Sequence, residues 1–326
     1  MKNLLLICGG ANAESEVSIA SYENINSYID RAKFNIISIL ILNDNTWILK
    51  ESRELVHLIN KNGQGVLLVD SNNSFKEINI DVIFPILHGK GVEDGQIQGF
   101  FETLNIPYVG SKVLSSALCF DKIAAKTIVK SCGISVVNFV EYDDEMNYEK
   151  ACESLQTRDL FIKPSNSGST FGASKASNVE QFHKSILLAK QFDGSVLIEK
   201  YLPNVRELFC PIFQDTVCDI VEVVIQKEFF DFEDKYSETS EAKVLVHKSL
   251  ENNLYSQVQT LSLQIFKILR CHNFARIDFL LSEDGELYFS EVNSIPGMGT
   301  KSLMLSSLMA MGYDMRDIVS KMIERC

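Results

Sequence analysis

The sequence predicts an α/β protein whose first third forms a mainly parallel sheet, with mixed α+β structure in the rest of the chain. Three observations support this prediction. Apolar runs of strand length alternate with helical segments over residues 3–104. A β-hairpin pattern occupies residues 275–293. The chain has 326 residues, of which 46% are apolar and 23% charged, and this length is enough for two or three packed domains.

The first third alternates strands with helices. Its first apolar run ends at a Gly-Gly pair and has the length of a buried strand. We expect strands at 3–8, 34–42 and 81–87, and helices at about 14–28 and 95–104. This alternation is typical of a parallel sheet with helical connections.

The remaining chain is expected to contain helices at about 115–132, 178–191 and 253–270 and at the C-terminus, with strands at 159–165 and 195–202. Domain boundaries are expected near residues 120 and 202, although no linker rich in Pro, Gly or Ser marks them. The predicted domains are residues 1–119, 120–202 and 203–326.

Composition argues against several classes of protein. The net charge of −12, from 31 basic and 43 acidic residues, disfavours nucleic-acid binding. No apolar stretch approaches the roughly 18 residues that a membrane-spanning helix needs. The eight cysteines are scattered without a C-x-x-C motif, so a reducing cytoplasm fits best. The five histidines are widely spaced, which disfavours a His-based metal centre.

The hairpin at 275–293 carries the first sign of chemistry. Its central Asp-Gly pair favours a two-residue type I′ turn, and that turn places Asp278 opposite Glu291 and Arg276 opposite Asn293. The four polar side chains then share one face of the hairpin. Two carboxylates about 4 Å apart repel by about 4 kcal/mol near a protein surface, so another group must offset the repulsion.

Two explanations account for the opposed carboxylates. In the first, they lie on a solvated strand face and Arg276 neutralises them. In the second, the carboxylates and the amide oxygen of Asn293 hold a divalent cation whose shell is completed by phosphates. The hairpin alone does not distinguish the two.

Two glycine-rich segments are candidates for ligand binding. NSGSTFGAS, at 166–174, follows a strand that contains Lys163; it is either an ordinary turn or a loop whose backbone N–H groups approach phosphate oxygens. A second glycine-rich turn, with His88, ends an apolar strand, where open parallel sheets bind ligands. Neither is a P-loop, because G-x-x-x-x-G-K-[ST] is absent.

Two further polar features allow two explanations each. Glu14, in the first turn of the first helix, either complements the helix dipole or binds an ammonium group. Residues 229–243 lose apolar periodicity and contain Lys235 and Tyr236. This segment is either a solvated loop or a lid that brings a cation and a hydroxyl to a closed site.

Together and in this order, seven motifs resemble those of the D-alanine:D-alanine ligases of the ATP-grasp superfamily. They are GGANAESEVS, LHGKGVEDGQIQG, IPYVGSKVLSSALCFDK, FIKPSNSGSTFG, FFDFEDKY, ARIDF and EVNSIPGMGTKSL. The resemblance covers essentially the whole chain. It implies a three-domain ATP-grasp enzyme of the cytoplasm, with ATP between the central and C-terminal domains, and a homodimer, since the family is usually dimeric.

The resemblance also implies nucleotide and metal ligands. Asp278, Glu291 and Asn293 match the ligands of two Mg²⁺ ions, for which Mn²⁺ is an alternative, so the resemblance favours the second explanation of the hairpin. The matches to phosphate-, adenine- and ribose-binding positions are Lys122, Lys163, Ser169, Thr170, Glu199, Lys200, Tyr201, Leu202, Glu207 and Lys235.

For the amino acids, Glu14 matches the group that holds the ammonium of the first D-alanine. Arg276 and the backbone N–H of Gly297 match the donors that stabilise the tetrahedral transition state. Glu14, Ser169 and Tyr236 match a hydrogen-bonded trio that joins the domains. The remaining matches at the substrate site are His88, Lys235, Ser302 and Leu303.

The implied reaction makes D-alanyl-D-alanine for peptidoglycan precursor synthesis. The carboxylate of the first D-alanine attacks the γ-phosphate of ATP, and the amine of the second attacks the resulting acylphosphate. The protein would contribute positioning and charge neutralisation rather than a covalent nucleophile.

Departures from the family pattern lie mostly around the second amino acid. Gly299 stands where Thr is usual, and Met304-Leu305 stand where a pair with Pro is common. An acceptor such as D-serine therefore stays open, although Tyr236 favours a dipeptide over an ester. A non-catalytic nucleotide-binding protein is disfavoured, because all four polar residues of the hairpin are present.

Overall fold

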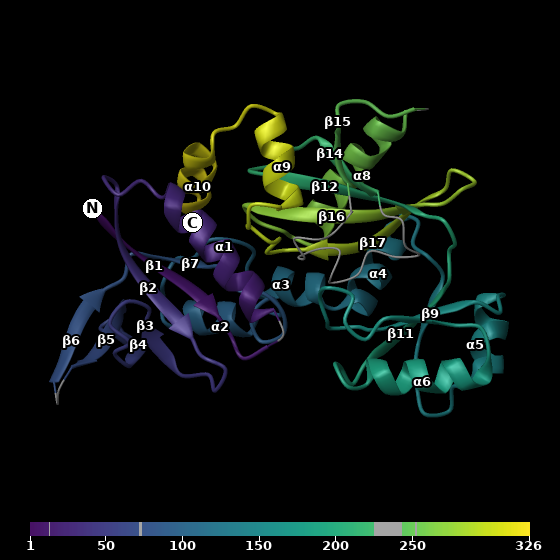
Figure 1. The fold of residues 1–326 in the computed structure, drawn as a ribbon, viewed down its shortest axis with the longest axis horizontal. Coiled ribbons are helices and arrows are strands. Elements are labelled where there is room, and N and C mark those ends of the chain that lie inside the picture. The colour runs from purple at the N-terminus through teal and green to yellow at the C-terminus, as the bar shows by residue number, and fades with distance from the viewer. Residues whose placement is uncertain (13, 72–73, 225–242, 252) are drawn as a thin grey trace.

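The computed structural model describes residues 1–12, 14–71, 74–224, 243–251 and 253–326. Within these residues the strands form four sheets (Figure 1). Two belong to the N-terminal part of the chain, one to the middle, and the largest to the C-terminal part. In this part of the chain, no helix is both long enough and apolar enough to cross a membrane.

The first sheet has the strand order β3-β2-β1-β7. β1 pairs in parallel with both β2 and β7, and only β3 is antiparallel, so the predicted mainly parallel sheet is confirmed. The strands are β1 (Lys2–Gly9), β2 (Phe34–Ile41), β3 (Trp47–Leu49) and β7 (Val82–Pro85). The helices that follow β1 and β7 are α1 (Ser15–Tyr28) and α2 (Gln96–Thr103).

The second sheet was not predicted. It is an antiparallel meander of β4 (Val56–Lys61), β5 (Gln64–Ser71) and β6 (Ser74–Asn79). β6 is exposed along most of its length, so its sequence lacks the apolar alternation that identifies a half-buried strand. Leu58, Leu67 and Val69 of the meander pack into the core beside the first sheet.

The helix expected at about 115–132 is two helices, α3 (Val113–Phe120) and α4 (Lys122–Ser131). Asp121 separates them, because its backbone is extended and its carboxylate accepts the N–H of Ala124 as an N-cap. The same carboxylate accepts the hydroxyl of Ser165 at 2.7 Å, which fixes the start of α4 beside the end of β9.

The central sheet has the order β10-β9-β11-β8. Its strands are β8 (Phe139–Glu141), β9 (Leu160–Pro164), β10 (Ser174–Ala176) and β11 (Val196–Lys200). The helices α5 (Tyr148–Leu155) and α6 (Val179–Ala189) pack against this sheet around the buried side chain of Phe182 (Figure 1).

The C-terminal sheet has the order β15-β14-β12-β16-β17, with β13 beside β12. Its strands are β12 (Arg206–Phe213), β13 (Thr216–Val217), β14 (Ile220–Val224), β15 (Lys243–His247), β16 (Phe274–Leu281) and β17 (Leu287–Asn293). Side chains alternate along β16: Ala275, Ile277 and Phe279 join a core with α4 and α8 (Leu254–Ile268). Arg276 and Asp278 therefore face the other side.

The predicted pairing of the hairpin is confirmed at the polar residues: Asp278 opposes Glu291, and Arg276 opposes Asn293. The predicted type I′ turn is wrong. That turn needs two successive residues with positive φ, and in this turn only Gly285 has one, at 86°.

The turn has three residues, Glu-Asp-Gly, and shifts the register by one, so that Leu281 opposes Leu287. A β-bulge at Ser290 then shifts it back before Glu291. The bulge therefore restores the pairing that the simpler turn would have produced.

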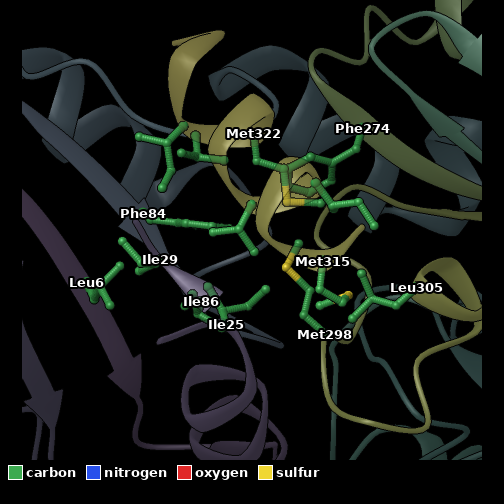
Figure 2. Close-up of a cluster of buried hydrophobic side chains, with 14 of the residues drawn as sticks. Leu6, Ile25, Ile29, Phe84, Ile86, Phe274, Met298, Leu305, Met315 and Met322 are labelled. Atoms are coloured by element: carbon green, nitrogen blue, oxygen red, sulfur yellow. The ribbon is translucent and has the colours of Figure 1, made fainter. Parts of the chain in front are cut away.

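A shared core joins the two ends of the chain (Figure 2). Side chains of the first sheet and of α1 pack with side chains of α9 (Leu303–Ala310), α10 (Met315–Glu324) and the loop before α9. Figure 2 labels Leu6, Ile25, Ile29, Phe84, Ile86, Phe274, Met298, Leu305, Met315 and Met322. Helix α1 therefore lies against the C-terminal part of the chain.

Candidate active site

Two adjoining cavities lie where the first, central and C-terminal sheets meet. The larger has a volume of about 510 Å³ and reaches from α1 to the β16–β17 hairpin. The smaller, of about 150 Å³, lies against β9, β11 and the segment after β11. Both are lined by Lys122, residues 167–169, Glu207 and Glu291, so the cavities adjoin at these residues.

The polar hairpin residues form a paired cluster in the wall of the larger cavity. Arg276 donates to both carboxylate oxygens of Asp278, at 2.7 Å each, and Asn293 Nδ2 donates to Oδ2 at 2.9 Å. Glu291 pairs with Lys122 at 3.2 Å. Asp278 is only 5% exposed and so does not lie on a solvated face, but Arg276 is its neutralising partner, as the first explanation expected.

The side-chain oxygen atoms of Asp278, Glu291 and Asn293 are suitable ligands for a divalent cation that phosphate groups also bind. They belong to two carboxylates and one amide on neighbouring strands. The described residues contain no group of three or more His, Cys, Asp or Glu that could hold a metal ion alone. Oxygen atoms of phosphates and water would therefore have to complete the shell, as Mg²⁺ prefers.

Glu199 of β11 lies between two ammonium groups. Lys163 Nζ is 2.7 Å from Oε2 and Lys126 Nζ is 2.6 Å from Oε1. The geometry at Oε1 is not that of a hydrogen bond, so that contact is an ion pair. Lys126 is fully buried on α4 and also donates to the carbonyl of Phe289 in β17 at 3.3 Å.

The two lysines set the charge of Glu199. Burial alone would raise the pKa of this carboxyl group, but the ammonium groups of Lys126 and Lys163 outweigh burial and lower the pKa to about 2. Burial lowers the pKa of Lys126. Sequence reasoning missed Lys126; its signal was a lysine one helical turn after Lys122, on a face that is otherwise apolar.

The smaller cavity suits a flat base. Phe161 and Leu280 supply apolar walls, and the segment 200–202 after β11 forms one edge. Tyr201 packs its ring 6.4 Å from that of Phe161. The residues predicted for adenine, ribose and phosphate that line this cavity are Lys122, Lys163, Ser169, Thr170, Glu199, Lys200, Tyr201, Leu202 and Glu207.

Glu14 lies at the opposite end of the larger cavity. It is the N-cap residue of α1, but its side chain makes no capping hydrogen bond; Ser169 Oγ donates to Glu14 Oε1 at 2.6 Å, across 155 residues of sequence. Ser169 and Thr170 both have positive φ, at 52° and 65°, which is uncommon for residues with side chains and often marks a functional loop. Two members of the predicted trio are therefore in contact.

Two glycines allow the close approach of backbone to Glu14. A Cβ on Gly168 would lie 2.8 Å from the Glu14 carboxylate, and one on Gly89 would lie 2.7 Å from it. Asn12 fixes this arrangement, because its Oδ1 accepts the N–H of Glu14 and its Nδ2 donates to the carbonyl of His88.

Glu93 is a second buried carboxyl group at this end of the cavity, and sequence reasoning missed it. It is 8% exposed and accepts the N–H of Gly89 at 2.7 Å. Burial, together with the charge of Glu14, raises its pKa. The signal in the sequence was an acidic residue inside the glycine-rich turn that ends an apolar strand.

The remaining predicted residues line the larger cavity in different ways. His88 is 4% exposed, and burial lowers its pKa to about 4, so the imidazole is neutral at pH 7. Ser302 caps α9 by accepting the N–H of Leu305. Gly297 and Leu303 also line the cavity. Lys235 and Tyr236 lie outside the described residues.

Comparison with known proteins gives a consistent result along the chain. The family model described as the N-terminus of D-ala D-ala ligase matches residues 3–111, and the C-terminal model matches 128–324. A relative from Oceanobacillus iheyensis named D-alanine--D-alanine ligase is 32% identical, over 99% of this chain and 94% of its own.

Solved structures agree. D-alanyl-alanine synthetase A from Vibrio cholerae has a TM-score of 0.88 at 26% identity and covers 99% of this chain and 97% of its own. VanG D-Ala:D-Ser ligase from Enterococcus faecalis has a TM-score of 0.82 at 31% identity and covers 98% of both chains. The chain therefore belongs to the D-alanine:D-alanine ligase family, a family of ATP-dependent ligases with the ATP-grasp fold.

Proposed function

We propose that this protein uses ATP to join two D-alanines into D-alanyl-D-alanine, a precursor of peptidoglycan, in the cytoplasm. One observation supports the proposal beyond the family match: of two adjoining cavities, the smaller is lined by the Lys163–Glu199 pair and the larger by Glu14. This arrangement supports separate positions for a nucleotide and an amino acid in one site.

At the nucleotide end, Glu199 and residues 200–202 would hold the adenine and Glu207 the ribose. Lys122, Lys163 and the backbone of the 166–174 loop, with Ser169 and Thr170, would neutralise and enclose the phosphates. Two Mg²⁺ ions, or Mn²⁺, would be held by Asp278, Glu291 and Asn293 and would shield the charge of the phosphates. The short Lys122–Glu291 distance supports a shared position beside the phosphates.

At the amino-acid end, Glu14 would bind the ammonium of the first D-alanine. Arg276 and the N–H of Gly297 would stabilise the oxyanion when the second amine attacks the acylphosphate. Ser302, Leu303 and His88, with Lys235, would surround the second amino acid, and Tyr236 would complete the trio with Glu14 and Ser169. The position of Glu14 in the wall of the larger cavity, where it is 8% exposed and accepts a hydrogen bond from Ser169, supports its role.

We further propose domains of residues 1–119, 120–202 and 203–326 and a homodimeric assembly. The second boundary has support in the fold, since residue 202 lies between β11 of the central sheet and β12 of the C-terminal sheet.

A second candidate is the same ligase chemistry with D-serine or another amino acid as acceptor. Two observations favour keeping it: a 31% identical relative is named a D-Ala:D-Ser ligase, and Gly299 leaves its part of the cavity wall without a side chain. Nothing lies within 4 Å of the place where a Cβ on Gly299 would stand.

The test is phosphate release from Mg-ATP with D-alanine, L-alanine, D-serine or D-lactate alone, and with D-alanine paired with each of the others. Products are identified by mass. Release with D-alanine alone, together with the mass of D-alanyl-D-alanine, supports the proposal. If phosphate is released only when a second compound accompanies D-alanine, that compound is the acceptor. No release under any condition overturns both candidates.

A further inference from the structure

The loop between β17 and α9 is held from α1 at both backbone groups of one residue, Met298. The N–H of Met298 donates to Ser21 Oγ at 3.0 Å, and the carbonyl of Met298 accepts from Asn24 Nδ2 at 2.7 Å. Ser21 and Asn24 are three residues apart, so both face the loop from one side of the helix. The Met298 side chain is fully buried in the core of Figure 2.

A second contact holds the loop ahead of Gly297. Ser21 is fully buried, and its Oγ lies 3.4 Å from His88 Nε2. Ser21 Oγ, which accepts the Met298 N–H, is therefore also within reach of the His88 ring. The imidazole in turn lies beside the backbone of Ile295, which acts to raise its pKa against the larger effect of burial. Residues on both sides of Gly297 are thus connected to Ser21.

Gly297 needs such support. Nothing lies within 4 Å of where a Cβ would stand on it, and it lines the larger cavity. Glycine has the widest range of backbone conformations, so contacts at the adjacent residues limit the directions that its N–H can take. An oxyanion donor contributes to the rate only if its direction is fixed before the reaction.

We propose that Ser21 and Asn24 are positioning residues that hold the Gly297 N–H in the direction needed for oxyanion stabilisation. The inference rests on the proposed function. It also links the two ends of the first D-alanine: Glu14 precedes α1 and Ser21 lies two turns along it, so one rigid helix fixes both the ammonium ligand and the oxyanion donor.

The test compares Ser21→Ala, Ser21→Thr and Asn24→Ala with wild type. The matched control is Ser262→Ala, which removes another fully buried hydroxyl, one that donates within α8 to the carbonyl of Val258, away from the loop. Phosphate release and dipeptide mass give kcat and the KM values for ATP and D-alanine, and thermal unfolding reports the folded fraction.

We expect Ser21→Ala to lower kcat about 10-fold, because removing an oxyanion donor outright costs roughly 100- to 1000-fold and a displaced donor costs less. The KM for ATP should stay within two-fold of wild type. Asn24→Ala should lower kcat less than Ser21→Ala, and Ser21→Thr, which keeps the hydroxyl, should recover most of the loss. Ser262→Ala should match wild type.

The inference is overturned if folded Ser21→Ala and Asn24→Ala both keep kcat within two-fold of an active wild type. It is also overturned if Ser262→Ala loses as much kcat as Ser21→Ala, since the effect would then be a general cost of an emptied hydroxyl site. An inactive wild type would instead overturn the proposed function, and this inference with it.

Discussion

Glu199 and Glu93 are both buried carboxyl groups that line the candidate site, one at the nucleotide end and one at the amino-acid end. Two ammonium groups within 2.7 Å lower the pKa of Glu199 to about 2. Glu93 accepts a hydrogen bond from Gly89, and burial together with the charge of Glu14 raises its pKa. Two carboxyl groups with similar burial therefore have pKa values shifted in opposite directions.

The difference follows the charge of the expected ligands. An adenine base is uncharged and cannot neutralise Glu199, so lysines of the protein must do so. At the other end, the proposed substrate D-alanine carries an ammonium group, which would favour the charged form of a carboxyl group beside it. The comparison teaches that two carboxyl groups of similar burial differ in pKa because two lysines lie within 2.7 Å of Glu199, whereas burial and the charge of Glu14 dominate at Glu93.

The largest effect is expected at Glu291, which lines both cavities and faces Lys122. Glu291→Gln removes one of the two carboxylates that would hold Mg²⁺, and turnover should fall by at least about 1000-fold, as for a lost electrostatic group in a site of this kind. Phosphate release measured over a range of Mg²⁺ concentrations checks this. Glu286→Gln, an exposed position on the same hairpin, is the control. Turnover within a few-fold of wild type would refute the metal assignment.

The next effect concerns the nucleotide end. Lys126→Met removes one of the two cations that hold Glu199, and the free energy of unfolding should fall by about 3 kcal/mol, since breaking a buried pair leaves a charge less compensated. Urea denaturation measures this. Lys130→Met, exposed on the same helix, should unfold like wild type. Equal stability of the two variants would contradict the role given to Lys126.

The same pair predicts a pH dependence. The pKa of Glu199 is about 2 in the folded protein, whereas the ordinary pKa of a glutamate side chain is 4.5. Its ionisation therefore stabilises the fold above pH 4.5, and this contribution is lost as the pH falls toward 2. Lys126→Met should show a shallower loss in this range, because its Glu199 is less strongly held in the charged form.

The sequence predicted what depends on local pattern and missed what depends on distant contacts. Alternating apolar runs were enough for the parallel sheet. The pairing of Asp278 with Glu291 was predicted correctly although the turn was wrong, because a bulge at Ser290 offsets the three-residue turn. A bulge has no reliable signal in one sequence, since its extra residue differs from its neighbours only in pairing.

The missed residues show the same limit at the site. Lys126 and Glu93 are titratable residues whose environments depend on partners 73 and 79 positions away, Glu199 and Glu14. Their own segments give a local signal for each residue, but nothing in them identifies those partners. The break at Asp121 is local, but an N-cap inside a helical stretch is also compatible with an uninterrupted helix.

The smallest effect tests the amino-acid end. Because its pKa is raised, Glu93 keeps its proton in the folded protein at pH values above about 4.5, where the unfolded chain releases it. The free energy of unfolding should therefore fall as the pH rises above about 4.5. Glu93→Gln should remove this slope and be more stable than wild type at pH 8 by about 1 kcal/mol, relative to their difference at pH 5. Denaturation at pH 5 and pH 8 without Mg²⁺ or substrate measures this difference, with Glu286→Gln as the exposed control. Parallel pH profiles for Glu93→Gln and wild type would contradict the prediction.

Binding of D-alanine should reverse the effect, because its ammonium group favours the charged carboxylate. Calorimetry in buffers of different ionisation enthalpy should therefore detect proton release when D-alanine binds to wild type, and less proton release with Glu93→Gln.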